Sequence, residues 1–271
     1  LIDVPSPSIA DIRMSMRLIP YAQDQWLLVV RDVSTLLKLE QVRRDFVANV
    51  SHELRTPLTV LYGYLDLIDS ENDPELSGMV CEMRKQSTRM AQIVDDLLTL
   101  SRLDAQANTD DESIAMDAML ASLRRDAEAL SQQQHDIRVD TTSVHGIRGS
   151  ANDLHSAFAN LVANAVRYTP PGGKIVVRWF DEDDGSCFEV EDSGCGIPKE
   201  HLPRISERFY RVSTSRSRDK GGTGLGLSIV KHVLGLHQAR LEIRSEVGTG
   251  SIFSAHFPHA RLIDGTEHES A

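Results

Sequence analysis

Two segments of this chain carry apolar residues three and four positions apart, and this spacing constrains the fold more than any other feature. In the first segment the stripe consists of Val47, Val50, Leu54, Leu58, Leu61, Leu65 and Ile68. Such spacing predicts an amphipathic helix with one buried face. Between Ser34 and about Ser70 the helix breakers are Pro57 and Gly63. We therefore predict one long helix that bends at Pro57.

A second segment continues the pattern after a short turn at Asp69–Pro74. Its seam consists of Leu76, Met79, Met83, Gln86, Met90, Ile93, Leu97 and Leu100. Two helices joined by a short loop form an antiparallel hairpin. A single hairpin cannot enclose both stripes, so we predict that two chains pair into a four-helix bundle and that the protein is a homodimer.

The segments on either side of this hairpin have different patterns. Apolar and polar residues alternate from Ile12 to Leu18, and a second strand is predicted at Trp26–Val30, so the chain opens with a β-hairpin. A polar linker follows the helices at Ala105–Asp111. Beyond it we predict helices at 117–133, 150–168 and 227–236, and strands at 137–139, 146–148, 174–180, 186–191, 240–245 and 251–257. This order predicts a two-layer α/β sandwich, with a capping box at Ser150 and Asp153 and a disordered tail from His259.

Charge and cysteine content exclude several function classes. The formal net charge of −11 opposes binding of a nucleic-acid backbone, so we expect no nucleic-acid partner. Cys81, Cys187 and Cys195 are an odd number without CxxC spacing, which indicates neither a disulfide framework nor a zinc site and favours a reducing compartment. No signal peptide and no apolar run of about 18 residues is present. Because the chain begins with Leu1, we expect it to be the cytoplasmic portion of a bacterial protein anchored in the inner membrane through a segment preceding it.

His52 lies off the apolar stripe and beside Glu53. Near neutral pH one imidazole nitrogen has a lone pair that can attack a phosphoryl group, while the other can donate to a carboxylate. A single exposed histidine on a helix is usually only a solvated residue. Here, however, the run SHELRTPL resembles the phosphoacceptor motif of the sensor histidine kinases. The resemblance implies that His52 is phosphorylated, that Glu53 accepts or orients its proton, and that Thr56 positions a water molecule.

The predicted helix that begins after Ser150 carries a second motif. Asn160, Asn164 and Tyr168 recur every four residues, beside Arg167, and carboxamide oxygens are good ligands for hard cations. Two asparagines alone are weak evidence. The full run NLVANAVRYTP resembles the N-box of the ATPase superfamily shared by histidine kinases, Hsp90 chaperones and type II topoisomerases. This implies ATP and Mg²⁺ as cofactors, with Asn164 on the metal and the other three residues lining the nucleotide.

Three glycine-containing runs follow. In the run from Asp192 to Pro198, the carboxylate of Asp192 can accept from the adenine amine, and Gly194, Gly196 and Ile197 follow it. The run GGTGLGLS, with Gly222, Thr223, Gly224, Leu225 and Gly226, leads into a helix, where backbone amides can bind phosphates. It resembles the G2 box of the histidine kinases, with Arg211 to Lys220 as a cationic lid. The run around Thr249 resembles their G3 turn.

The motifs follow the order found in the histidine kinases, and ANVSHELRTPLTVL and ISERFYRV resemble the phosphate-regulon branch. The resemblance implies a PAS-type remnant at 1–33, a dimerisation and histidine phosphotransfer domain at 34–105, an ATP-binding domain of the Bergerat fold at 106–258 and a tail at 259–271. It also implies phosphotransfer to the receiver domain of a response regulator, phosphatase activity toward that regulator, and a role in phosphate starvation.

Two other readings stay open. An ATP-driven conformational clamp would share the N-box and the glycine runs, but it would not use HELRTP. A structural dimerisation module would explain the helical hairpin and nothing beyond Asp111.

Overall fold

A computed structural model describes residues 2–5, 13–22, 25–35, 58–59, 61–65, 74–105, 112–212 and 222–264. The chain divides into two compact units, residues 1–53 and 54–271. Most of the long helix predicted between Ser34 and Ser70 lies outside the described residues. Within them, residues 58–59 and 61–65 are helical, as predicted. No helix among the described residues is both long and apolar enough to cross a lipid bilayer.

The first unit contains an antiparallel sheet in the order β1-β2-β3. Its strands are β1 (Ile2–Pro5), β2 (Arg13–Ala22) and β3 (Gln25–Asp32). The predicted hairpin is confirmed, although β2 runs on through Pro20, where the register with β3 shifts. Every residue of β3 is exposed, so within the described residues neither face of this strand is covered.

The second unit begins with the helical hairpin. Helix α2 (Pro74–Ala105) packs on the preceding helical residues, since the Arg84 guanidinium donates to the Leu65 carbonyl at 2.9 Å. Val80, Ser87 and Val94 of α2 are buried and spaced by seven, and the Ser87 hydroxyl donates to the Leu58 carbonyl at 3.5 Å. Within one chain, Met79, Met83 and Met90 of the predicted seam are 52%, 48% and 44% exposed. The seam is predicted for a bundle of two chains and stays a prediction.

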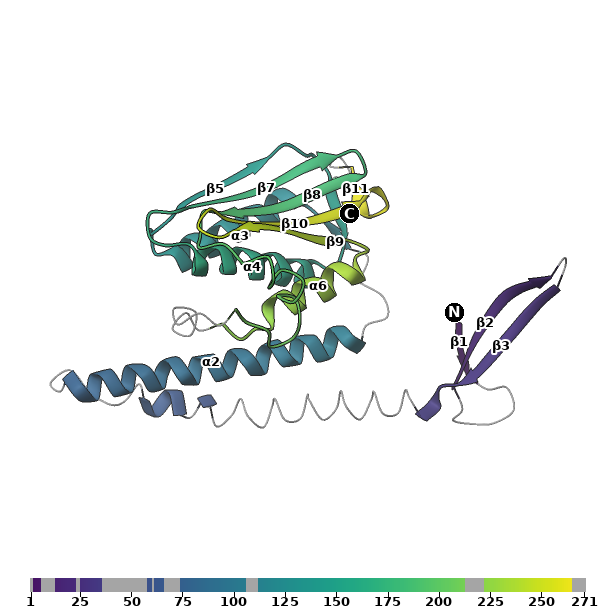
Figure 1. Cartoon of the computed structure of the whole chain (residues 1–271), viewed down its shortest axis with the longest axis horizontal. Coiled ribbons are helices and arrows are strands. Elements are labelled where there is room, and N and C mark those ends of the chain that lie inside the picture. The colour runs from purple at the N-terminus through teal and green to yellow at the C-terminus, as the bar shows by residue number, and fades with distance from the viewer. Residues whose placement is uncertain are drawn as a thin grey trace. The chain divides into compact units, whose positions relative to one another are not determined.

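A mixed five-stranded sheet forms one layer of the remaining domain, in the order β5-β7-β8-β10-β9. Its strands are β5 (Asp136–Thr141), β7 (Lys174–Glu182), β8 (Gly185–Asp192), β9 (Arg240–Glu246) and β10 (Gly250–Pro258). β5 pairs with β7 in parallel and the other neighbours are antiparallel. The helices α3 (Met116–Ser131), α4 (Ala151–Tyr168) and α6 (Gly226–Leu236) form the other layer, as Figure 1 shows. The predicted two-layer sandwich is confirmed.

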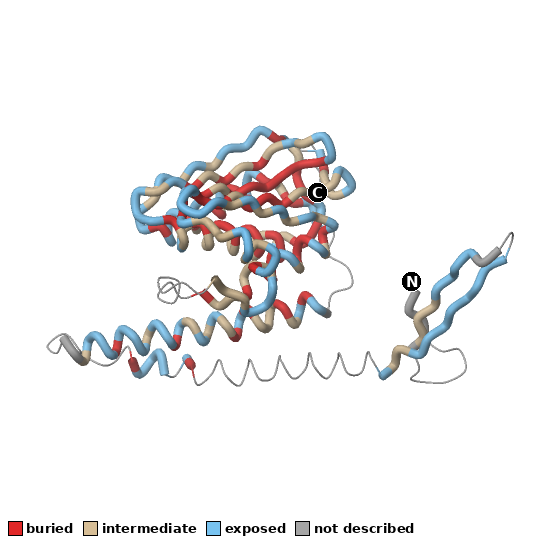
Figure 2. Tube along the Cα trace, viewed as in Figure 1, coloured by how far each residue is buried: buried red, intermediate tan, exposed pale blue. Residues whose placement is uncertain are grey.

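The core lies between these two layers, where Figure 2 shows the buried trace. Leu154, Phe158, Leu161 and Ala165 lie on the buried face of α4. The Phe158 ring stacks on Phe188 of β8 with centroids 3.9 Å apart, and Phe257 of β10 meets Trp179 edge-on. Burying each of these aromatic side chains contributes about 2–3 kcal/mol, so the sheet and α4 are held as one body.

Two sequence predictions need correction at the edge of the domain. Ser150 accepts from the Asp153 amide, but the Asp153 carboxylate binds Arg102 of α2, so the capping box is only half formed. Residues 259–264 are not a disordered tail. They form a 3₁₀ turn (His259–Arg261) and β11 (Leu262–Ile263), which joins β6 (Gly146–Gly149) and β4 (Glu112–Ile114) in a small sheet.

Candidate functional site

The predicted site residues divide into those that the structure describes and those that it does not. His52, Glu53 and Thr56 lie outside the described residues, and so do residues 213–220 of the predicted lid. The remaining predicted residues lie on α4, on the turns after β8 and β9, and at the start of α6. The geometry of these elements can be compared with the predicted nucleotide site.

The amide side chain of Asn160 connects α4 with the start of α6. Its Nδ2 donates to the Ser156 carbonyl at 2.9 Å, which fixes the carboxamide on the helix. Its Oδ1 faces Gly226 so closely that a Cβ on that glycine would lie only 2.6 Å away. Gly226 therefore permits the approach of the two helices at this point.

The end of α4 approaches the glycine run before α6. A Cβ on Gly222 would lie 3.3 Å from Nη1 of Arg167 and 3.6 Å from the hydroxyl of Tyr168. Gly222 is buried, whereas Arg167 is exposed. The structure thus places the cationic and aromatic residues of the predicted N-box beside the predicted phosphate loop.

The carboxylate of Asp192 lies at the end of β8, where it is 6% exposed. The Gly194 amide donates to its Oδ1 at 2.8 Å, and the backbone of Ser251 provides a second hydrogen bond. Burial raises the pKa of Asp192 to about 6, with a smaller contribution from Glu191, and the two backbone bonds oppose this rise. An N–H donor on a ligand stabilises the charged form of such a buried carboxylate.

Two turns are joined around Asp192. The Gly248 amide donates to the Cys195 carbonyl at 2.9 Å, and the Ile197 amide donates to the Ser245 hydroxyl at 2.8 Å. Gly196 has φ of +68°, and a Cβ there would lie 2.0 Å from the Glu246 carbonyl. The predicted residues Gly194, Gly196 and Ile197 therefore form one structural unit with the turn that carries Thr249, whose side chain is exposed.

The loop before α6 is held from two sides. Gly224 has φ of +76° and its carbonyl accepts from the Phe209 amide at 2.9 Å. The Thr223 hydroxyl accepts from the Leu225 amide at 3.2 Å and donates to Asp96 of α2 at 2.7 Å. Leu225 itself is fully buried. The loop thus ends at a helix N-terminus, where backbone amides and the helix dipole favour an anion.

The contacts from α2 have no signal in the sequence. Asp104 binds Arg208 at 2.8 Å and lies 3.4 Å from His232 of α6, while Asp96 binds Thr223. Leu100 and Leu103 of α2 also belong to the main hydrophobic core. These residues lie on a different element from every glycine run, so only the tertiary fold brings them to the loop.

Most of the described site residues therefore converge at one end of the sandwich. Asn160, Arg167 and Tyr168 meet the loop before α6, and the Tyr168 carbonyl accepts from Cys195 of the Asp192 turn at 3.4 Å. Asn164 and Arg211 are half-buried. A cavity of about 90 Å³ lies elsewhere, beside Met116, His145 and Ile263, and contains none of the predicted residues. The arrangement can bind an adenine at Asp192 and phosphates at the N-terminus of α6.

Two family models match the chain. Residues 149–261 match the family described as histidine kinase-, DNA gyrase B- and HSP90-like ATPase, and residues 42–106 match the His Kinase A (phospho-acceptor) domain. The first match contains every described residue of the nucleotide site, and the second contains His52, Glu53 and Thr56.

Curated relatives are similar over nearly the whole chain. It is 47% identical over 268 residues to the phosphate regulon sensor protein PhoR of Pseudomonas aeruginosa, which covers 97% of this chain and 60% of that protein. It is 36% identical over 259 residues to the sensor-like histidine kinase SenX3 of Mycolicibacterium smegmatis, covering 94% and 67%. The chain thus spans about three fifths of the length of the first relative.

Among solved structures, the crystal structure of full-length ShkA in complex with AMPPNP is similar, with a TM-score of 0.62 and 26% identity. The match covers 79% of this chain and 45% of that one. This likeness extends beyond one domain.

Proposed function

This chain belongs to the sensor histidine kinases of two-component systems, and from that premise we propose that it transfers the γ-phosphoryl group of ATP to His52. The observation that carries the proposal is the convergence of α4, the Asp192 turn and the loop before α6 at one end of the sandwich. Nucleotide binding at this place would present the terminal phosphate toward the helical hairpin.

Each part of the nucleotide has a suitable partner in this arrangement. The buried carboxylate of Asp192 accepts a hydrogen bond from the adenine amine. Guanine would place a carbonyl at this point, so two hydrogen-bond acceptors would face each other. Tyr168 and Arg167 lie where an aromatic ring and a cation can contact the base, sugar or phosphates. The amides from Gly222 to Gly226 bind the phosphates, assisted by Arg211 from the lid.

The donor set on α4 also fits a magnesium ion. Mg²⁺ keeps several waters and takes few protein ligands beside substrate phosphates, so the carboxamide of Asn164 is sufficient as the protein ligand. The ion would neutralise charge on the phosphate oxygens. Asn160 shares the same face of α4 and holds its carboxamide against Gly226.

The phosphoryl step follows from the imidazole of His52. One ring nitrogen attacks the γ-phosphorus in line, ADP leaves, and Glu53 accepts or orients the proton on the other nitrogen. The resulting P–N bond keeps the group transferable to an aspartate in the receiver domain of a response regulator. Thr56 positions water for dephosphorylation of that regulator.

We extend the proposal to the domain bounds and the assembly. Residues 34–105 would form the phosphotransfer domain and 106–258 the ATP-binding domain. Exposed Met79, Met83 and Met90 on α2, together with Leu61, support pairing of two such hairpins, because a stripe of this size gains from burial. Residues 1–33 would be the last strands of a PAS-type domain, since β3 leaves its apolar residues exposed.

The biological context is likewise a proposal. The similarity to a phosphate regulon sensor protein supports a role in signalling phosphate starvation. The protein would act at the inner membrane through a segment outside this chain, with its catalytic domains in the cytoplasm.

Incubation with γ-labelled ATP tests the proposed reaction. We expect acid-labile, base-stable label on the chain and none on His52→Gln, with ATP binding unchanged in that variant. ATP turnover without labelled protein would support a conformational clamp instead. Label retained in the variant would reject His52 as the acceptor.

A further inference from the structure

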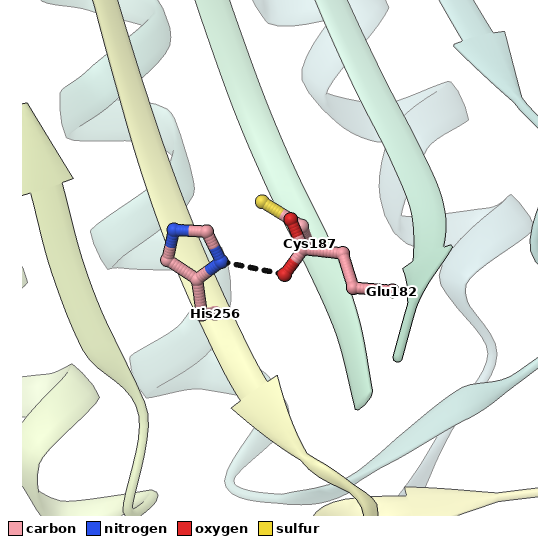
Figure 3. A group of neighbouring side chains, drawn as sticks. All are labelled: Glu182, Cys187 and His256. Atoms are coloured by element: carbon pink, nitrogen blue, oxygen red, sulfur yellow. Dashed lines mark hydrogen bonds and ion pairs between the residues drawn. The ribbon is translucent and has the colours of Figure 1, made fainter. Parts of the chain in front are cut away.

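The sheet has a second face, which the helices do not cover. Along β7 the side chains of Ile175, Val177 and Trp179 are buried against the helices, so the alternate residues point to the other side. On this open face, three potential metal ligands meet at one end of the sheet. They are Glu182 of β7, Cys187 of β8 and His256 of β10, which Figure 3 shows together.

Strand pairing explains why these three residues lie together. Cys187 and His256 are direct partners in the register of β8 and β10. Phe180 is the partner of Cys187 on β7, and Glu182 lies two residues further on the same face. One ligand atom from each side chain lies within 4.8 Å of the others, and His256 Nδ1 is 2.7 Å from Glu182 Oε2.

We propose that Glu182, Cys187 and His256 bind a zinc ion on the open face of the sheet. A thiolate, an imidazole and a carboxylate are the ligand types that Zn²⁺ takes, at about 2.0–2.3 Å. Small rotations of the three side chains bring their ligand atoms to these distances from a single zinc ion. The Glu182 side chain is 32% exposed, so water can enter and provide the fourth ligand.

A neighbouring carboxylate is placed to orient the histidine. Nε2 of His256 is buried and makes no hydrogen bond, although Oε2 of Glu242 on β9 lies 3.5 Å away. A histidine that binds metal through one nitrogen commonly donates its other N–H to a carboxylate. A metal ion at Nδ1 of His256 fixes the ring proton on Nε2. Glu242 is then the carboxylate that accepts a hydrogen bond from this N–H.

The charges around the thiol favour a cation. The carboxylates of Glu182, Glu189 and Glu242 lie near enough to the Cys187 thiol for their charges to act on it. Arg178 and Arg244 pair with Glu189, and Arg244 also lies 3.5 Å from Oε1 of Glu242. The other oxygen of Glu242 and the carboxylate of Glu182 face the two ring nitrogens of His256.

The spacing of cysteines in the sequence indicated no zinc site, because the ligands come from three strands. The site is also separate from the nucleotide site. Asp192 alternates with Glu191 along β8 and faces the helices, whereas Cys187 faces the open side. Metal binding and ATP binding can therefore fail independently of each other.

Titration of the chelator-treated chain with Co²⁺ and Zn²⁺, in the absence of nucleotide, tests the proposal. We expect one equivalent of Co²⁺ to give a thiolate-to-cobalt absorption band, and saturating Zn²⁺ to raise the Tm by about 5 °C or more. Cys187→Ser should abolish the band. Glu242→Gln should weaken Zn²⁺ binding by about 10–100-fold, the loss typical when a metal site loses a supporting group, and His256→Gln should weaken it further because it removes a ligand.

Cys81→Ser and His259→Gln are matched controls, because Cys81 lies on α2 and His259 lies beyond β10. Both should bind Co²⁺ as the unmodified chain does. Cobalt spectra without a thiolate band, equal Zn²⁺ affinity in His256→Gln, or no binding by the unmodified chain would overturn the proposal. If Cys187→Ser does not fold, the two glutamine variants still decide the question.

Discussion

Replacing Asp192 with asparagine should stabilise the protein without nucleotide while weakening ATP binding. The carboxylate is buried, and its pKa rises from an ordinary value of 3.8 to about 6. The folded state thus holds a charge that it disfavours at neutral pH. Asparagine has nearly the same shape and carries no charge.

The size of the effect follows from this shift. A difference of about two pKa units corresponds to about 3 kcal/mol. The carboxylate also accepts backbone bonds from Gly194 and Ser251, and losing one of them costs about 1 kcal/mol. We therefore expect Asp192→Asn to gain about 2 kcal/mol in the free energy of unfolding near pH 7.

The dependence on pH gives a second check. Because the folded pKa is raised, the wild-type carboxyl stabilises fully below its unfolded pKa, and this contribution is lost as pH rises through about 6. The increase in the free energy of unfolding caused by Asp192→Asn should accordingly be present above pH 6 and disappear near pH 4. Urea unfolding in a Trp26→Phe background measures it, since Trp179 in the core is then the remaining tryptophan.

Two results would refute this reasoning. The variant could be no more stable than the wild type near neutral pH, which would mean that the charge is not costly. Alternatively, the gain could persist unchanged at low pH, in which case it would not come from ionisation. An ATP affinity equal to that of the wild type would argue against the adenine contact.

Three further predictions concern the same site. ATP affinity should fall below pH 6, by up to about tenfold per pH unit, because the protonated carboxyl is a weaker acceptor for the adenine amine than the carboxylate; calorimetry at several pH values measures this. Gly226→Ala should weaken ATP binding about tenfold, because the new methyl group displaces Asn160. Gly235→Ala is the control: there is open space around this glycine, so the substitution should raise the free energy of unfolding by about 0.5–1 kcal/mol and leave ATP binding intact. Asp96→Ala should tighten ATP binding by about fivefold, because it releases the Thr223 hydroxyl for a phosphate; an unchanged or lower affinity would mean that this contact does not compete with the nucleotide.

Periodicity predicted the elements of the sandwich well because their burial is decided locally. Leu154, Phe158 and Leu161 fall on one face of a helix wherever that helix packs, and the alternating residues of β7 behave likewise. The glycine runs were also predictable, since Gly196 and Gly224 have positive φ angles, which glycine adopts at the lowest cost.

Other features depended on contacts between distant segments. The pattern of α2 did not reveal that Val80, outside the predicted seam, would be buried and Met83, within it, exposed in one chain, because packing chooses between neighbouring apolar residues. Asp153 looked like half of a capping box until Arg102 from another helix supplied its partner. The zinc ligands needed the register of β8 and β10, which no local pattern encodes.

The alternation along β8 also limits how this protein can change. Asp192 faces the helices and Glu191 the open side, so shifting the strand by one residue would exchange them. A single deletion in β8 would put a glutamate into the core and expel the carboxylate that we propose binds adenine. Point substitutions on the open side can accumulate without this penalty, so we expect related proteins to differ there in side chains and not in strand length.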